Sequence, residues 1–393
     1  MRPQRRSLHL VQRRRTEPGV APGTVSVDPE ARPSKIRVVT YTAETAVEHA
    51  MPDVAMVGPL CRPDRVIWVS VEGLRDTRVL EELALLFGLH PLALEDVVNL
   101  HQRPKVEAYD DHLYCVVRMP TLQGGRLDVQ QVSLFVGAGF VVTFQERSCG
   151  CLDPVHRRLL QSGPSRLRRS GADYLAYAII DTIVDRYFPV LHTFGERLED
   201  VEDRVLDPAR EDLIPHIHEI RRDLLHLRRS VWPLGEAIGR LLREEAEADF
   251  ISDDLRPYLR DLQDHASQLR EGIDLCHSMV EGLMEAYRSA VNLRANEVMR
   301  VLTVFATLFL PLSFIASLYG MNFNPHASPF NMPELNWYAG YPFALTLMAA
   351  IAAGLLLFFR RRGWLGRLRG FEKLPDETAP RSARKDENDD GHR

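Results

Sequence analysis

Two long stretches without a charged residue lie near the C-terminal end of the chain, and they limit its architecture more than any other feature. The first, at 301–319, reads VLTVFATLFLPLSFIASLY, and the second, at 336–359, reads NWYAGYPFALTLMAAIAAGLLLFF. Each stretch is close to the roughly 20 apolar residues that an α-helix needs to cross the hydrocarbon of a bilayer. The sequence therefore predicts two transmembrane helices, at 301–319 and 338–359.

Basic residues gather at one end of this pair of spans. Arg294 and Arg300 precede the first span and three arginines at 360–362 follow the second, whereas the loop at 320–337 contains no Lys or Arg. Cytoplasmic flanks of membrane helices carry the excess of positive charge. We therefore expect a multi-pass protein of the cell (inner) membrane, embedded in lipid, with both termini in the cytoplasm.

Two different patterns precede the spans. Short β-branched and aromatic runs, such as RVIWVSVEG at 65–73, indicate strands, and Gly88 and Pro91 divide a helical pattern into two short helices. After residue 172 the strand signals vanish, and apolar residues recur three or four positions apart among charges. The last of these patterns predicts one continuous helix from near Pro257 to Tyr319.

Both ends of the chain are polar and charged, with six arginines in the first 15 residues, and we expect them to be disordered. An Arg-rich start is also compatible with a nucleic-acid arm or a transit peptide, but we favour a solvated cytoplasmic tail and expect no nucleic acid partner. The predicted order is a basic disordered tail at 1–33, an α/β cytoplasmic domain at 34–150, a stalk of long helices at 172–300, a pore-lining helix at 301–319, an outer loop at 320–337, a second transmembrane helix at 338–359 and a basic, then charged, cytoplasmic tail at 360–393.

The sequence offers little support for catalysis. The turn VGAGFVV at 136–142 connects two strand patterns and is not followed by a helix, which argues against a phosphate-binding loop. The five cysteines are scattered, and no Ser-His-Asp or Cys-His set stands out. We therefore do not expect an enzyme.

One face of the first span mixes amide, hydroxyl, small and apolar side chains without a charge. Steps of three and four residues connect Asn296, Met299, Thr303, Ala306, Leu310, Ser313 and Ser317. Such a stripe is compatible with a pore lining, and equally with close helix–helix packing, which small and hydroxyl residues also favour.

The stripe suits a hydrated cation if it does line a pore. No carboxylate occurs from Val301 to Pro333, and Mg²⁺ gives up its water ligands reluctantly. Neutral Asn side chains can accept hydrogen bonds from those waters. Asn296 and Asn322 would lie about 39 Å apart along a helix, and Met299, Leu302 and Leu310 would form apolar constrictions between them.

The triplet Gly320-Met321-Asn322 stands where the first span ends. Gly320 allows the helix to stop and the backbone to turn. The triplet therefore predicts a turn that presents amide oxygens to a hydrated cation, although an ordinary glycine cap followed by a loop asparagine has the same sequence.

Several of these segments together resemble the CorA family of magnesium/cobalt transport proteins, which are Gly-Met-Asn channels. The resemblance rests on NEVMRVLTVFATLFLPLSFIASLYGMN at 296–322, MPEL at 332–335 and HPLALEDVVNLHQRPKVE at 90–107. It implies a homopentameric funnel whose pore is lined by the first span. It also implies a selectivity filter at Gly320, Met321 and Asn322, with an inner asparagine ring at Asn296.

The resemblance further implies regulatory Mg²⁺ between subunits, bridging Asp96 of one copy to Asp261 of the next. Glu95 and His265 lie beside these positions as further candidate ligands. Loss of the bridging ions would let acidic surfaces repel each other and open the pore. Mg²⁺ would therefore be both the transported and the regulatory ion.

The resulting hypothesis is a passive channel for Mg²⁺ influx that also conducts Co²⁺ and Ni²⁺ and is gated by cytoplasmic Mg²⁺. Two alternatives stay open: a zinc or other transition-metal transporter on the same scaffold, and a membrane metal sensor that conducts nothing. The outer loop departs from the family pattern in a longer stretch, NPHASPFN at 324–331. Its His326 is a candidate ligand for softer metals, but we favour a solvated loop side chain.

Overall fold

The computed structural model describes residues 19–28, 30–50, 53–161, 163, 165–205, 213–244, 251–322, 324, 328 and 330–364. The chain divides into two compact units between Tyr287 and Arg288, and each unit is considered separately below. Most of both predicted tails, together with His326, lies outside the described residues.

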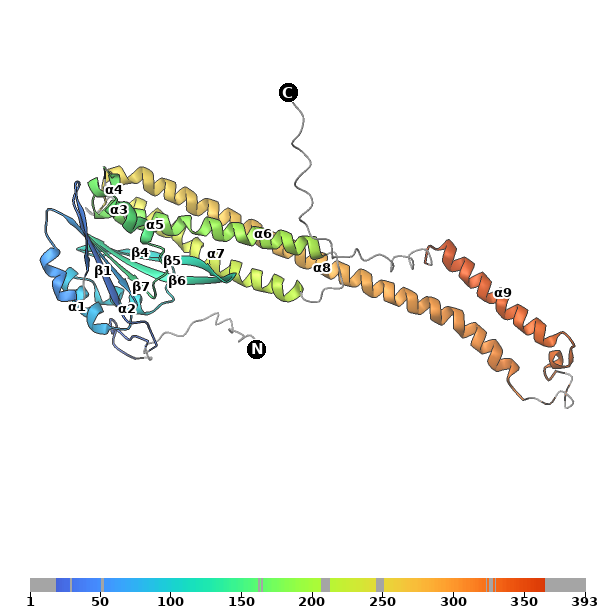
Figure 1. Ribbon diagram of the computed structural model, residues 1–393. Helices are drawn as coiled ribbons and strands as arrows, with labels where there is room; N and C mark the ends of the chain where they lie inside the picture. The colour runs from blue at the N-terminus through green and yellow to red at the C-terminus, as the bar shows by residue number, and fades with distance from the viewer. Residues whose placement is uncertain are drawn as a thin grey trace, which may run out of the picture. The chain divides into compact units, whose positions relative to one another are not determined.

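The first unit contains a mixed sheet. Its strands are β1 (Lys35–Tyr41), β2 (Ala46–Ala50), β3 (Val66–Glu72), β4 (Lys105–Ala108), β5 (His112–Gln123), β6 (Arg126–Gly137) and β7 (Phe140–Gln145). They run in the order β2-β1-β3-β7-β6-β5-β4, and neighbouring strands are antiparallel except β3 and β7, which are parallel. This mixed sheet confirms the α/β character predicted for the N-terminal part of the chain (Figure 1).

Alternation along the strands divides the core between the two faces of the sheet. In β3, Trp68 joins one apolar cluster while Ile67 and Val69 join the other, because successive side chains point to opposite faces. The helices α1 (Thr77–Phe87) and α2 (Pro91–Val98) cover the second cluster. Gly88 adopts a left-handed conformation with φ of 65° and ends α1, and Pro91 begins α2, which confirms the predicted break.

Helices build the remainder of the described chain. They are α3 (Asp153–Leu160), α4 (Arg166–Arg169), α5 (Ala172–Asp185), α6 (Tyr187–Val205), α7 (Leu213–Glu244), α8 (Arg256–Tyr319) and α9 (Gly340–Arg361), with short 3₁₀ turns at Val54–Met56, Gly58–Leu60, Asp253–Leu255 and Pro333–Asn336. The unbroken course of α8 to Tyr319 confirms the predicted long helix.

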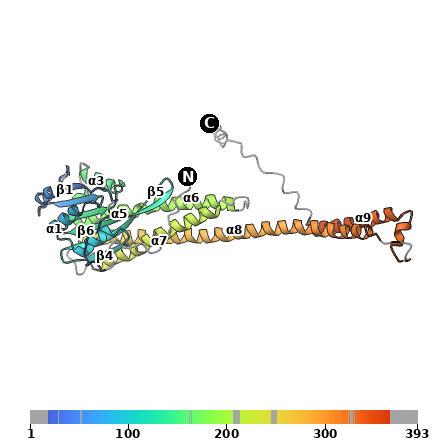
Figure 2. The same ribbon diagram turned by 90° about the horizontal axis from the view of Figure 1, so that it is seen from below.

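The part of α8 in the first unit is amphipathic. Its buried residues recur at helical spacing from Leu259 through Leu262, Leu269 and Val280 to Leu283. They belong to the same apolar cluster as residues of α5, α6 and α7, which lie beside α8 in both ribbon views (Figures 1 and 2). The predicted stalk is therefore a packed group of helices on the other face of the sheet.

The second unit contains the end of α8, the outer loop and α9. Both helices are long and apolar enough to cross a membrane, and 0% and 11% of their most apolar windows are buried. The chain reverses after Tyr319, so that the guanidinium of Arg300 lies 5.9 Å from the ring centroid of Trp364, just past α9. The basic flanks of the two apolar helices therefore meet at one end.

A buried histidine ties α3 to the sheet. The ring of His156 is 2% exposed and stacks on Trp68, with centroids 3.7 Å apart, while Trp68 Nε1 donates to Thr143 Oγ1 at 3.1 Å. Burial, followed by the nearby Arg37, lowers the pKa of His156 from 6.5 to about 4. The folded protein therefore holds this imidazole neutral.

We expect this histidine to make stability depend on pH. Because its pKa is lowered on folding, its contribution is complete above pH 6.5 and is lost as the pH falls towards 4. The loss should be about 3 kcal/mol in the free energy of unfolding. Thermal unfolding of the full chain between pH 7 and 4 should show a smaller drop for His156→Phe than for wild type. The exposed His192→Phe should behave like wild type, and identical curves for His156→Phe and wild type would refute this account.

Candidate functional site

The predicted stripe on the first span lies on the side of α8 that this chain leaves open. Asn296, Met299, Leu302, Thr303, Ala306, Leu310, Ser313 and Ser317 are all exposed. The half-buried residues are Val301, Val304, Leu308, Pro311, Leu312 and Ile315. At 3.6 residues per turn the two sets occupy opposite faces of the helix.

The polar groups of the stripe are spaced along an otherwise apolar surface. Thr303 Oγ1 donates to the carbonyl oxygen of Met299 at 2.7 Å, so its proton is directed at the helix backbone and its lone pairs remain open. Met299 and Leu310 are 60% and 73% exposed. Polar side chains that can accept hydrogen bonds and exposed apolar side chains therefore alternate along the stripe, and its role as a pore lining remains a prediction.

The first span ends in a tight turn. Gly320 N donates to the carbonyl oxygens of Ala316 at 2.9 Å and Ser317 at 3.2 Å, and Met321 N donates to Leu318 O at 3.2 Å. Gly320 does not adopt a left-handed conformation, so the helix ends without the usual glycine cap geometry. A Cβ atom at Gly320 would lie 3.3 Å from Ala316 O, and Asn322 follows as an exposed side chain.

The predicted regulatory carboxylate of Asp96 already has partners within its own chain. Lys105 Nζ lies 2.6 Å from Asp96 Oδ2, and Gln102 Nε2 donates to Asp96 Oδ1 at 2.6 Å. Lys105 also contacts Glu107 Oε1 at 2.7 Å. Burial opposes the charge of Lys105, but hydrogen bonds to Asp96 and Glu107 outweigh it and raise the pKa of the ammonium.

The other predicted regulatory residues lie in two places. Glu95 Oε2 accepts a hydrogen bond from Gly23 N at 2.8 Å. On α8, Asp261 is largely exposed, and its Oδ2 lies 3.9 Å from His265 Nε2. Within the described part of one chain, no hydrogen bond or ion pair links Asp96 or Glu95 to Asp261 or His265, and the predicted bridge between copies remains a prediction.

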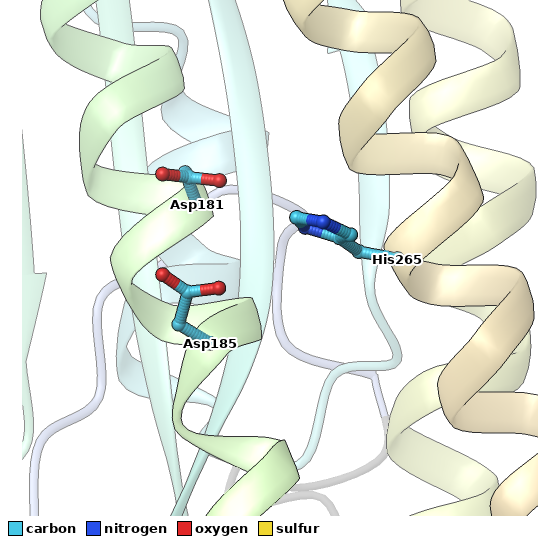
Figure 3. A group of neighbouring side chains, drawn as sticks. All are labelled: Asp181, Asp185 and His265. Carbon is cyan, nitrogen blue, oxygen red and sulfur yellow. The ribbon is translucent and has the colours of Figure 1, made fainter.

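The structure brings His265 together with two carboxylates that the sequence analysis missed. Asp181 and Asp185 lie one turn apart on α5, and His265 points towards them from α8 (Figure 3). One ligand atom from each of the three residues lies within 4.8 Å of the others. This mixture of oxygen and imidazole nitrogen suits a divalent transition metal.

The electrostatics of this group favour a bound cation. Burial, then the neighbouring Asp185, raises the pKa of Asp181, while His265 acts in the opposite direction. His265 Nδ1 is buried without a hydrogen-bond partner in the described part of the chain. A cation would reduce the repulsion between the carboxylates and accept the unused lone pair of the imidazole.

Comparison with known proteins identifies the family. The sequence model of a family described as "CorA-like Mg2+ transporter protein" matches residues 63–361. The chain belongs to the CorA family. Members of the CorA family are membrane transport proteins that carry divalent cations, and they are not enzymes.

The similarity to these relatives extends over most of the chain. The cobalt/magnesium transport protein CorA of Thermotoga maritima is 36% identical over 350 residues, covering 88% of this chain and 97% of that protein. The putative metal ion transporter YfjQ of Bacillus subtilis is 35% identical over 302 residues, covering 76% and 89%. The solved structure of CorA from Methanocaldococcus jannaschii has a TM-score of 0.70 at 19% identity and covers 84% of this chain and 98% of its own, which shows a shared fold.

We expect the group formed by Asp181, Asp185 and His265 to bind Co²⁺. Titration of the full-length protein in detergent, followed by the visible absorption of Co²⁺, should give at least about tenfold weaker binding, or 1.4 kcal/mol, for His265→Gln and for Asp181→Asn. His277 lies on the same helix, 3.7 Å from Glu281 and outside the group of three, so His277→Gln is the matched control. Unchanged affinity in both site variants would remove the group as a metal site.

Proposed function

We propose that this CorA-family protein is a passive channel through which Mg²⁺, and also Co²⁺ and Ni²⁺, enter the cytoplasm. The observation that carries the proposal is the uncharged, exposed face of α8 from Asn296 to Ser317, followed by Asn322. The printed names of relatives from Thermotoga maritima and Methanocaldococcus jannaschii, both cobalt/magnesium transport proteins, support the choice of ions.

A path for ions requires several copies of the chain. Two apolar helices cannot enclose an aqueous route, and within one chain they bury almost none of their apolar windows. In a homopentamer the open face of each first span would point at a common axis. The half-buried face would turn towards the other membrane helix of the same chain. The stripe from Asn296 to Ser317 would then line the pore.

Selection would act on the hydrated ion. The described turn at Gly320 and Met321 leaves Asn322 exposed at the end of the span, where its amide oxygen can accept hydrogen bonds from water around Mg²⁺. No carboxylate lies between Val301 and Pro333 to hold the ion tightly. Weak contacts to the water shell permit both entry and release.

Gating would depend on competition for Asp96. A bridging Mg²⁺ between Asp96 of one copy and Asp261 of the next must displace the ammonium of Lys105, which lies 2.6 Å from the carboxylate. When cytoplasmic Mg²⁺ falls, Lys105 recovers Asp96, the bridge opens and the subunits separate. The exposed position of Asp261 leaves it accessible to a neighbouring copy.

Ion uptake into liposomes that contain the purified protein tests the function directly. Mg²⁺ entry that internal Mg²⁺ suppresses would support the channel and its feedback. Entry of Zn²⁺ alone, steepened by a proton gradient, would favour a transition-metal transporter, and the absence of flux for Mg²⁺, Co²⁺, Ni²⁺ and Zn²⁺ would favour a sensor.

Replacing Asn322 with Ala should reduce Mg²⁺ uptake at least about a hundredfold, which corresponds to roughly 2.7 kcal/mol. The change removes an exposed amide and leaves the hydrogen bonds of the turn intact, so assembly should not alter. The control is Asn331→Ala, because Asn331 Nδ2 bonds to Asn324 O in the same loop. Wild-type flux in Asn322→Ala would contradict a role in selection.

Neutralising Asp96 and Asp261 together, as Asp96→Asn with Asp261→Asn, should raise the internal Mg²⁺ concentration for half-closure at least about tenfold. The bridge loses both carboxylates, so closure needs more ion. Asp264→Asn, at a neighbouring exposed position on α8, is the control. If the dose–response curves of the double variant and wild type coincide, the two residues do not regulate the channel.

A further inference from the structure

A hollow of about 740 Å³ opens in the first unit between α7 and the segment that follows α2. It is lined by His101, Gln102, Arg103, Pro104, Arg118, Val129, Leu225, His226, Arg228, Arg229, Ser230, Trp232 and Pro233. Binding sites for small molecules commonly have volumes of about 300–1,000 Å³. None of the residues placed in the ion path or the metal group lines it.

The lining is strongly basic. It contains four arginines, and none of the described residues that line it is acidic. Arg118, on β5, lies at its inner side and donates to the carbonyl oxygens of Leu100 at 2.8 Å and Val129 at 3.4 Å. Among the described residues no carboxylate lies within salt-bridge distance of Arg118 or Arg229. Burial lowers the pKa of Arg118, and Tyr187, Glu146 and Asp128 act in the opposite direction from a distance without outweighing it.

The opposite wall holds further guanidinium groups in position. The indole of Trp232 lies between two cations, with Arg228 at 4.6 Å and Arg270 at 4.3 Å from the ring centroid. The nearest described acid to Arg228 is Asp274, at 3.9 Å, and both side chains are more than 40% exposed. An ion pair of this length between two exposed side chains contributes little to stability. Arg228 is thus oriented by an aromatic face and available to an anion.

The positive charge of the arginines also acts on His226, which lines the hollow. Burial lowers its pKa first, and Arg229, Arg118 and Arg222 lower it further. Three separate guanidinium groups therefore act on one side chain in the hollow. An anion placed there would be attracted by the same guanidinium groups that disfavour a positive charge on His226.

We infer that this hollow is a binding site for an organic polyphosphate, of which a nucleoside triphosphate is the best fit. Guanidinium groups bind phosphate oxygens in pairs, and several of them around one cavity match several phosphate groups. Pro104, Leu225 and Pro233 add apolar surface suited to a base or sugar.

The hollow also adjoins the carboxylate of Asp96. Gln102 lines it, and the side chain of Gln102 donates to Asp96 Oδ1 at 2.6 Å. The backbone N–H of Gln102 donates to Gln131 Oε1 at 3.1 Å. Binding of an anion in the hollow does not require ion conduction, so a binding measurement can fail or succeed independently of the proposed channel.

Calorimetric titration of the full-length protein in detergent tests the inference, with ATP, pyrophosphate, inorganic phosphate and adenosine as probes in Mg²⁺-free buffer. We expect ATP to bind more tightly than pyrophosphate, phosphate and adenosine to bind weakly, and the affinity for ATP to fall with rising salt. Arg229→Gln should weaken ATP binding at least about tenfold, the loss expected for one charge-assisted hydrogen bond.

The matched control is Arg240→Gln, an exposed arginine on the same helix outside the hollow. Arg229 is exposed, so its replacement should leave thermal unfolding unchanged, and Arg118→Met provides a second variant at the inner wall. Equal ATP affinity in wild type, Arg229→Gln and Arg118→Met would overturn the inference, as would no binding of ATP. Tighter binding of a poly-glutamate peptide than of ATP would overturn it in favour of a protein partner.

Discussion

The packing of α8 against α5, α6 and α7 is the contact on which the rest of the structure depends. Buried residues from Leu259 to Leu283 hold the first half of a 64-residue helix to the sheet domain. Each buried leucine contributes about 1.5–3 kcal/mol through removal of apolar surface from water. Beyond Leu283 this seam stops, and Leu293 and Val298 are 64% and 61% exposed. In the proposed pentamer, other copies of the chain or lipid would cover these residues.

Charge is distributed in opposite ways in the two units. In the first unit, ionisable groups are concentrated, and some are closely partnered, as in the contact of Lys105 with Asp96 and Glu107. In the second, the described apolar helices carry charge only at one end, where Arg300 meets Trp364. In the proposed channel, this separation of charge would allow the ion to be sensed in the first unit and conducted in the second.

Local patterns were sufficient to predict much of the fold. The apolar runs specified both membrane helices, Gly88 and Pro91 specified the break between α1 and α2, and helical spacing specified α8. The strands β2 and β4 and helix α3 were not predicted, because each is short and polar. Their positions depend on pairing or packing with distant segments, such as β1 or Trp68.

The candidate metal site at Asp181, Asp185 and His265 shows the same limit. His265 was a candidate from the resemblance, but Asp181 and Asp185 lie 80 or more positions earlier in a helix that reads as ordinary and amphipathic. Only the packing of α5 beside α8 brings the three together (Figure 3). The local signal was a pair of acids four residues apart on α5, of which Asp181 is half-buried and Asp185 is exposed.

In the proposed gate, the contact of Lys105 with Asp96 would determine the Mg²⁺ concentration at which the channel closes. A carboxylate that already contacts an ammonium group can bind Mg²⁺ only by losing that contact, so binding exchanges one cation for another. The set point is then the difference between two affinities, so a change at Lys105 shifts the threshold while both metal ligands stay the same. Lys105→Arg, Lys105→Gln and Lys105→Met would form a graded series of thresholds around one unaltered pair of aspartates.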